Sequence, residues 1–277
     1  MIVNADATQI YRDLPILSAA STVDEQARAE HRLFGVQDGA RSCSAADWAE
    51  MARREINEIQ ARGSLPILVG GSGLYLRTLL EGIAPVPSID LQVRRQVRES
   101  AVEDNRTMLE ALDPEAAARL KPADTARIAR ALEVILSTGR TLSDWQKDKA
   151  GGIASDVDLK PLILLPPRDW LYARCDGRFA HMVEQGAVDE VKALLERNLN
   201  PSLPVMRAIG VAELSAYLRG DLSLPDAISA GQQATRRYAK RQYTWFAHQP
   251  PADWPRLTEP LDVERIGGAL SLLGAPR

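Results

Sequence analysis

The segment LPILVGGSGLYLRTLL, residues 65–80, decides the fold. It opens on an apolar run, Leu65 to Val69, passes through Gly70-Gly71-Ser72-Gly73, and continues with the pattern of a helix. A second apolar run, Ile2 to Ala5, ends in a similar way at Asp6. Apolar runs that alternate with helices predict a parallel α/β sheet, whose functional groups lie where the strands end. We therefore expect Asp6 and the glycine loop at one edge of one sheet.

The rest of the chain divides into a core and an insertion. A third apolar run, Leu162 to Leu165, precedes another helical stretch and is expected to add to the α/β pattern. Residues 89–155 have the pattern of helices, interrupted at Asp113-Pro114 and Ser137-Thr138-Gly139, with no convincing strand. We predict an α/β core of residues 1–88 and 156–277, which includes basic C-terminal helices, and a helical insertion at residues 89–155.

The composition excludes several classes of protein. The 277 residues are 45% hydrophobic and 26% charged, as in an ordinary globular protein. No apolar run approaches the roughly 20 residues that span a bilayer, and the N-terminus does not resemble a signal peptide, so we expect no membrane partner and a cytoplasmic protein. The two cysteines and three histidines are scattered, which argues against a disulfide framework and a transition-metal site.

Two short motifs each have two interpretations. An acid directly after a strand, such as Asp6, can serve as a base or metal ligand, or it can cap the next turn. The loop Gly70 to Gly73 can bring backbone amides to a phosphate, or it can be a tight turn. It is not a Walker A loop, because the pattern GK[ST] occurs nowhere in the chain.

Basic residues are concentrated near the C-terminus. Residues 201–250 contain six Lys and Arg against three Asp and Glu, a local charge of +3 in a chain whose net charge is −3. A helix is expected to begin at Ser223, and its segment Thr235 to Phe246 mixes bases with aromatics, which can pair with phosphates and stack on nucleobases. A solvated basic face above a buried aromatic stripe is the alternative. Arg127 and Arg130 form a similar pair, suited either to a polyanion or to solubility.

Taken together, the motifs resemble the tRNA dimethylallyltransferase (tRNA isopentenyltransferase) family, from Ile2 to about His248. The matching pieces are Asn4-Ala5-Asp6, Gln9-Ile10-Tyr11-Arg12, His31-Arg32-Leu33, Val69 to Tyr75, Glu81-Gly82, Asp124 with Arg127 to Val134, Arg207-Ala208-Ile209-Gly210, Tyr238 to Gln242, and Thr244-Trp245-Phe246. Their order and spacing carry the resemblance.

The resemblance implies a fold, a reaction and a set of residues. The fold is a P-loop NTPase-like parallel sheet flanked by helices, with a helical insertion. The reaction transfers a dimethylallyl group from dimethylallyl diphosphate, with Mg²⁺, to N6 of adenosine 37, next to the anticodon, in tRNAs that read codons starting with U. The implied catalytic residues are Asp6, Ser72 and Arg94. The implied tRNA-binding residues are Asp6, Ala7, Thr8, Gln9, Ser72, Arg94, Ala126, Arg127, Ile128, Ala129, Arg130, Arg207, Ala208, Ile209, Gly210, Val211 and Ala212, to which the basic helix adds Arg237 and Arg241.

Three features depart from the family pattern. Ser72 stands where threonine is usual, and Val211-Ala212 replaces a usual Tyr followed by Lys or Arg. Family members also begin with a P-loop of the GPTxSGKS kind, typical of ATP-binding proteins, which we expect this chain to lack. Two alternatives stay open. One is a non-catalytic tRNA-binding remnant of the family that cannot hold the donor; the other is a P-loop kinase or NTPase, to which the sheet is generically similar, although the motifs of the tRNA-modifying family argue against it. The expected oligomeric state is a monomer, with the tRNA anticodon stem-loop as partner.

Overall fold

The computed structural model describes residues 1–261 and 265–273. Its contacts divide the chain into two compact units: the first consists of Met1–Leu79 and Asp156–Arg277, and the second of Leu80–Ser155. None of the helices in the described residues is both long enough and apolar enough to cross a bilayer.

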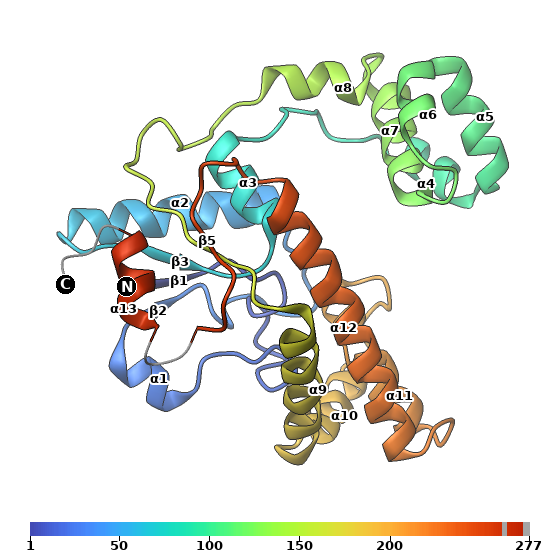
Figure 1. Cartoon of the computed structure of the whole chain (residues 1–277). Helices are drawn as coiled ribbons and strands as arrows, with labels where there is room; N and C mark the ends of the chain where they lie inside the picture. Colours follow the sequence, from blue (N-terminus) through green and yellow to red (C-terminus); the bar gives the residue numbers. More distant parts are fainter. Residues whose placement is uncertain (262–264, 274–277) are drawn as a thin grey trace. The chain divides into compact units, whose positions relative to one another are not determined.

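A three-stranded parallel sheet forms the centre of the first unit (Figure 1). Strand β1 (Ile2–Asn4) lies between β2 (His31–Arg32) and β3 (Ile67–Val69). Ile2 is opposite His31 on one side and Ile67 on the other, and Val3 is fully buried. Because β1 and β3 are neighbours that run in the same direction, Asp6 and the glycine loop follow adjacent strands at one edge, as predicted.

Helix α2 (Ala45–Ala61) connects β2 to β3 and lies along the sheet (Figure 1). Its start is fixed by a capping box, in which Ser44 and Asp47 each accept a hydrogen bond from the other's backbone N–H. Its buried side chains recur every three or four residues and include Trp48 and Ile56. The Trp48 indole Nε1 donates to the Asn4 carbonyl at 2.9 Å, which ties this helix to the end of β1.

The third apolar run forms a strand outside this sheet. Strand β4 (Ile163–Leu164) pairs in parallel with β5 (Arg256–Leu257), and these two make a separate sheet. Among the described residues, β3 is an edge strand, with Ile67 48% and Val69 52% exposed. The third run was expected to add to the α/β pattern, and β4 does form a parallel pair. However, the partner of β4 is β5, which follows α12 and is not part of the three-stranded sheet.

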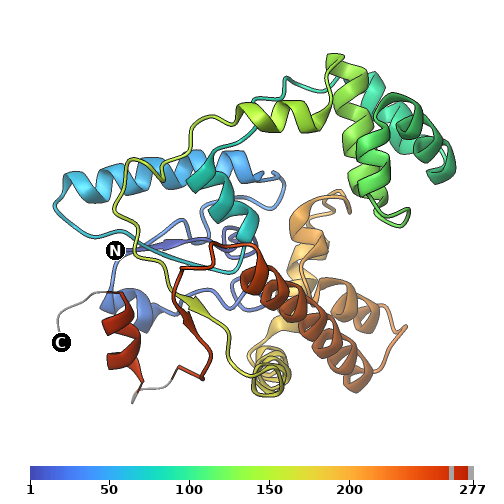
Figure 2. The same cartoon turned by 45° about the horizontal axis from the view of Figure 1, so that its top comes forward.

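Helices make up the rest of the first unit. Figure 1 and Figure 2 both show α9 and α12 side by side, and Gly231 of α12 leaves room for the Phe179 ring of α9. The N-cap of α12 is Ser223, as the sequence predicts. The helices of this unit, besides α2, are α1 (Val23–Arg28), α3 (Gly73–Glu81), which crosses into the second unit, α9 (Arg168–Glu184), α10 (Ala187–Glu196), η2 (Pro204–Arg207), α11 (Val211–Leu218), α12 (Leu224–His248) and α13 (Ile266–Leu272).

The second unit is helical around its own apolar core. The core contains Val97, Leu109, Ile128 and Leu132. The elements that follow α3 in this unit are α4 (Leu91–Glu99), α5 (Val102–Leu112), α6 (Pro114–Arg119), α7 (Thr125–Thr138), α8 (Leu142–Trp145) and η1 (Gln146–Asp148).

The second unit begins before the predicted insertion boundary at residue 89. The reason is that the first and last segments of this unit pair with each other. Ile83 and Ala150 exchange backbone hydrogen bonds of 3.0 and 3.1 Å, and Lys149 pairs with Glu81 at 2.5 Å. These contacts join the start of this unit, at Glu81 and Ile83, to the segment that follows η1.

Candidate active site

The turn after β1 is held rigidly by the side chain of Asn4, which is fully buried. Its Nδ2 donates to the carbonyl oxygens of Asp6 and Leu33, both at 3.0 Å, and its Oδ1 accepts from the Asp6 N–H at 2.8 Å. A buried amide with this many partners fixes the path of the chain. Asp6 is therefore presented by a turn whose geometry Asn4 determines.

The Asp6 carboxylate caps the turn that follows it. Its Oδ1 accepts from the backbone N–H groups of Thr8, at 2.7 Å, and Gln9, at 3.3 Å. The prediction that Asp6 can cap the turn that follows it is thus confirmed by these hydrogen bonds. The other oxygen, Oδ2, accepts no hydrogen bond from the described part of the chain, so the carboxylate is oriented at one atom and available at the other. That arrangement is also what a general base requires.

The glycine loop brings Ser72 beside Asp6. The Ser72 N–H donates to the Ala5 carbonyl at 3.1 Å, and the Ser72 Oγ accepts from the Ala7 N–H at 2.9 Å. Gly70 is needed here because a Cβ at this position would overlap the backbone of Ala5. The structure thus places two predicted catalytic residues, from segments more than sixty residues apart, on one edge.

Helix α12 packs directly on this loop. The Gln242 side-chain Nε2 donates to the Gly71 carbonyl at 2.9 Å, and a Cβ on Gly73 would overlap the Trp245 indole. The glycines therefore serve close packing between the loop and α12, which agrees with the tight-turn interpretation. Gly73 also begins α3, so its N–H lies in the first turn of a helix, where backbone donors are free of intrahelical bonds.

Tyr238 of α12 reaches the same edge and was not singled out as a site residue from the sequence. Burial raises the pKa of its hydroxyl, the negative charge of Asp6 raises it further, and hydrogen bonds with Ser72 and Gln242 oppose these effects. The Arg241 guanidinium lies 5.5 Å from the centre of its ring. Tyr238 therefore presents a protonated phenol next to Asp6 and a ring face to Arg241. The signal that could have found it is its spacing of four residues from Gln242.

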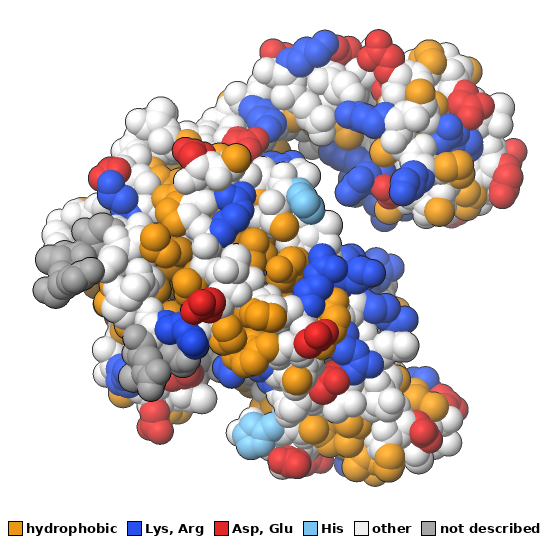
Figure 3. Space-filling model, viewed as in Figure 1, with side chains coloured by type: hydrophobic (Ala, Val, Ile, Leu, Met, Phe, Trp, Pro, Cys, Tyr) orange, Lys and Arg blue, Asp and Glu red, His pale blue; other side chains and the backbone are white. Residues whose placement is uncertain are grey.

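The basic residues of α12 differ in their surroundings. Arg237 and Arg241 are exposed, whereas Arg236 is bound to both carboxylate oxygens of Asp176 at 2.6 Å. Figure 3 shows Lys and Arg side chains gathered over part of this helix. Arg236 thus belongs to the packing between α12 and α9, and Arg237 and Arg241 are the guanidiniums available to a ligand.

The predicted segment Arg207 to Ala212 joins η2 to α11. Arg207 is exposed, while Gly210 is buried with a φ of +96°, and its N–H donates to Glu213 at 3.0 Å. A Cβ on Gly210 would meet the Leu17 and Phe179 side chains. The segment is a fixed turn in which Arg207 is the residue with a charged group in solvent.

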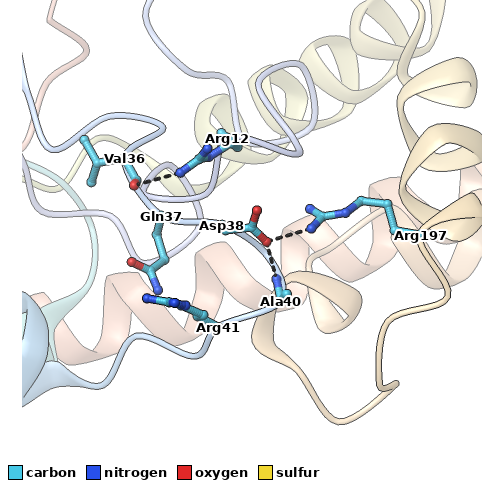
Figure 4. Close-up of a pocket in the computed structure, with 7 residues that line it drawn as sticks. All are labelled: Arg12, Val36, Gln37, Asp38, Ala40, Arg41 and Arg197. Atoms are coloured by element: carbon cyan, nitrogen blue, oxygen red, sulfur yellow. Dashed lines mark hydrogen bonds and ion pairs between the residues drawn. The ribbon is translucent and has the colours of Figure 1, made fainter.

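An open pocket of about 480 Å³ lies in the first unit (Figure 4). Arg197 bridges Asp13 and Asp38 there, the second at 2.7 Å, while Arg12 donates to the Val36 carbonyl at 3.3 Å. The residues that line the pocket are Arg12, Val36, Gln37, Asp38, Ala40, Arg41 and Arg197. Sequence reasoning did not find this pocket, because Arg197 comes from the end of α10 and the others come from the loops after β1 and β2.

The other predicted residues lie on the second unit. Arg94 belongs to α4, and the segment Ala126 to Arg130 belongs to α7. Arg127 pairs with Asp124 at 3.3 Å and is largely exposed. Arg94 and Arg130 both lie near the carboxylate of Glu133. Glu133 belongs to the motif Arg127 to Val134, but the sequence pattern alone predicts no role for it.

Comparison with known proteins decides the family. The family model described as IPP transferase matches residues 9–249 of the chain. This chain belongs to the IPP transferase family. The tRNA dimethylallyltransferases of Erythrobacter litoralis and Novosphingobium aromaticivorans are 58% and 60% identical to it, over 96% and 98% of this chain and 84% and 98% of their own lengths.

Solved structures of related enzymes share the fold. The tRNA isopentenylpyrophosphate transferase of Bacillus halodurans superposes with a TM-score of 0.67 at 31% identity, over 99% of this chain and 89% of that one. A eukaryotic dimethylallyltransferase described as acting on tRNA gives a TM-score of 0.74 at 26% identity, over 88% of this chain and 62% of its own. The family resemblance and the α/β class with a parallel sheet are thus confirmed. The roles of the individual site residues of this IPP transferase family member stay predictions.

The residues present are compatible with a magnesium ion that arrives with its substrate. Across residues 1–261 and 265–273, no three His, Cys, Asp or Glu side chains are placed to hold a metal ion. Mg²⁺ commonly takes one or two carboxylates and completes its shell with substrate phosphates and waters. A site with a single carboxylate, that of Asp6, beside the Ser72 hydroxyl suits this mode of binding.

Proposed function

We propose that the protein transfers the dimethylallyl group of dimethylallyl diphosphate to N6 of adenosine 37, on the 3′ side of the anticodon, in tRNAs that read codons starting with U. The observation that carries the proposal is the meeting of Asp6 and Ser72 on one sheet edge, under α12, in a member of the IPP transferase family. The relatives named tRNA dimethylallyltransferase support tRNA as the acceptor and dimethylallyl as the transferred group.

In the proposed reaction Asp6 acts on the acceptor. The N6 amine of adenine is a weak nucleophile because its lone pair is delocalised into the ring, so removal of a proton as the new bond forms lowers the barrier. The N6–C1 bond forms while the C1–O bond to diphosphate breaks, and the N6 proton passes to Asp6. The free Oδ2 is suited to take it, because Oδ1 is occupied by two backbone N–H groups.

Ser72 and Tyr238 are proposed to shape the pocket around the acceptor. The Ser72 hydroxyl is fixed by the Ala7 N–H, so it stays beside Asp6 without a substrate. The phenol of Tyr238, whose pKa is raised, remains protonated and can donate a hydrogen bond near neutral pH. Preorganised polar groups of this kind orient a base that has left its stack.

The negative charge that develops on diphosphate needs compensation. We propose Mg²⁺ for this role, bound chiefly by the diphosphate and water, with the Ser72 hydroxyl as the oxygen that this edge offers, because the free oxygen of Asp6 serves as the base.

The exposed arginines are proposed to bind the anticodon stem-loop. Extraction of adenosine 37 from its stack costs a few kcal/mol, which contacts with the RNA backbone offset. On the first unit these contacts would come from Arg207, Arg237 and Arg241, and on the second from Arg94, Arg127 and Arg130. Because tRNA is a cytoplasmic molecule, we propose that the protein acts in the cytoplasm. We also propose that it is a monomer, and light scattering of the purified protein tests this.

One assay separates the enzyme from a tRNA-binding remnant. Purified protein is mixed with unmodified tRNA, Mg²⁺ and dimethylallyl diphosphate, and the tRNA nucleosides are analysed by mass spectrometry. Saturable formation of N6-dimethylallyladenosine supports the enzyme. Salt-dependent tRNA binding without any product would support the remnant, the second candidate, which the exposed arginines of α12 favour.

A further inference from the structure

A buried carboxylate in the second unit gathers three arginines. Glu133 lies in α7 and is only 2% exposed. Its Oε1 accepts from Arg98 Nε at 2.8 Å, and its Oε2 lies 3.8 Å from Arg130 Nη1 and 4.0 Å from Arg94 Nε. Arg94 and Arg98 are one turn apart on α4, and Arg130 precedes Glu133 by three residues on α7. Two helices therefore direct three guanidiniums, here named the arginine face, at one carboxylate.

The arginine face is exposed although the carboxylate is not. The side chains of Arg94 and Arg130 are each 42% exposed, and that of Arg98 is 64% exposed. A guanidinium has five N–H donors in a planar fork, so one edge can face Glu133 while the other meets an anion in solvent. With one carboxylate against three guanidiniums, the face has a formal charge of +2.

The hydrogen bonds around Glu133 are incomplete. Of the three guanidiniums, that of Arg98 is within hydrogen-bond distance of the carboxylate, and Oε2 is in ion-pair range of the other two without bonding either. The Arg94 Nε is buried and has no hydrogen-bond partner among the described residues. A buried polar atom without a partner is uncommon and costly, so its position next to Oε2 calls for a reason.

We propose that Glu133 is a positioning residue for RNA: it holds Arg94 and Arg130 in one orientation, so that their outer edges bind phosphates of the anticodon stem-loop. The proposal rests on the proposed function, in which Arg94 and Arg130 contact tRNA. Without the carboxylate, three like charges crowd one face and repel one another, and the guanidiniums spread. When a phosphate binds the outer edge of the Arg94 guanidinium, the Nε of Arg94 still faces the Oε2 of Glu133.

The direction of the change in stem-loop affinity distinguishes a positioning role of Glu133 from a purely electrostatic effect. Glu133→Gln removes a negative charge from a basic face. If local charge alone mattered, the variant would bind every RNA more tightly. If Glu133 positions the arginines, the variant binds the substrate stem-loop more weakly, while its affinity for an unstructured RNA of equal length does not fall.

The test measures both affinities on the same protein samples. Fluorescence anisotropy is recorded with a labelled anticodon stem-loop and with poly(U) of the same length, at two salt concentrations. For E133Q we expect roughly three- to tenfold weaker stem-loop binding, a higher KM for tRNA and an unchanged kcat at saturating tRNA. The matched control is Glu110→Gln, because Glu110 is an exposed carboxylate of the same unit that pairs with Arg106 at 2.8 Å. Its stem-loop affinity should remain within about twofold of the wild type.

Two further variants protect the test against a folding defect. E133D keeps the charge and withdraws the carboxylate by one methylene, and we expect it also to weaken stem-loop binding. In a double-mutant cycle, E133Q and Arg94→Ala should be non-additive, because one acts through the other. Unchanged poly(U) affinity and circular dichroism show that the unit is folded.

The outcomes are distinct. Stem-loop binding by E133Q that equals or exceeds that of the wild type, or additivity with Arg94→Ala, overturns the positioning role. If Arg94→Ala and Arg130→Ala leave stem-loop binding unchanged, the RNA-binding role of this face is overturned along with it. If both weaken binding and E133Q does not, the proposed function stands and only the role of Glu133 is lost.

Discussion

The hydroxyl of Ser72 accepts a hydrogen bond of 2.9 Å from the backbone N–H of Ala7, across two loops that follow neighbouring strands. This bond fixes the separation of the glycine loop from the turn that bears Asp6. It also explains why a hydroxyl is required here: no other side chain in the described residues is hydrogen-bonded to the Ala7 N–H. The bond is therefore a structural reason for a hydroxyl at this position, where the family resemblance gives threonine as the usual residue.

Ser72→Ala should leave the Ala7 N–H without its acceptor. We expect a loss of about 1–2 kcal/mol in the free energy of unfolding and a fall of roughly tenfold or more in kcat/KM. The reason is that the hydrogen bond that joins the glycine loop to the turn bearing Asp6 is lost. Thermal unfolding and initial rates measure the two effects. Ser72→Thr retains the hydroxyl and should stay close to the wild type; equal losses in both variants would show that the hydrogen bond is not the cause.

Asp6→Asn tests the base separately from the cap. The amide oxygen can still accept from Thr8 and Gln9, so the turn should stay intact, while proton removal is lost. We expect the single-turnover rate of prenyl transfer to fall roughly 10²-fold or more and the tRNA affinity to stay nearly unchanged. Asp6→Ala loses both roles and should also lower the melting temperature. An Asn variant with a normal single-turnover rate would leave Asp6 with the capping role alone.

The sequence predicted those parts of the site that depend on local pattern. Asp6 and Ser72 follow apolar runs, and adjacent parallel strands end at one edge, so the sequence pattern alone was enough to predict that they meet. Tyr238 and Glu133 could not be assigned in this way, because their roles come from contacts between distant segments. The pairing of β4 with β5 also joins distant segments. In addition, β5 has only two residues, Arg256–Leu257, which is too short for a periodic pattern to be detected.

Gly73→Ala should disturb the packing of α12 on the glycine loop. The added Cβ would overlap the Trp245 indole, which also has the Arg77 guanidinium 5.4 Å from the centre of its ring. We expect a loss of about 1–3 kcal/mol in stability and a parallel loss of activity. The matched control is Gly177→Ala in α9, where nothing lies within 4 Å of a new Cβ and alanine favours the helix, so stability should rise slightly. Similar melting temperatures for the two variants would contradict the packing argument.

Ile67→Thr should delay aggregation of the protein at high concentration. Among the described residues β3 is an edge strand, and its side chains Ile67 and Val69 are 48% and 52% exposed, as is Leu65, two residues before the strand, at 72%. An exposed apolar edge strand is a template for pairing with another chain. Threonine keeps the β-branched shape and adds a hydroxyl, so static light scattering at rising protein concentration should show a later onset of aggregation. An unchanged onset would place the association elsewhere.

The arginines of α12 offer a contrast between binding and packing within a few residues. Arg237 and Arg241 are exposed and one turn apart, whereas Arg236 is bound to Asp176 of α9. If the exposed pair meets tRNA phosphates, Arg237→Ala with Arg241→Ala should weaken binding of all tRNAs alike and reduce the slope of log K against log salt by about one to two. The same variant should unfold at nearly the wild-type temperature.

Arg236→Ala is expected to do the opposite. It removes one cation from the same helix, but it leaves the partly buried Asp176 without its partner, so stability should fall by about 1 kcal/mol or more while the salt slope stays the same. Both quantities are measured on each protein, by thermal unfolding and by anisotropy titrations at several salt concentrations. If Arg236→Ala lowers the salt slope as much as the double variant does, binding follows the total charge of α12, and the distinction between a packing arginine and two ligand-binding arginines is wrong.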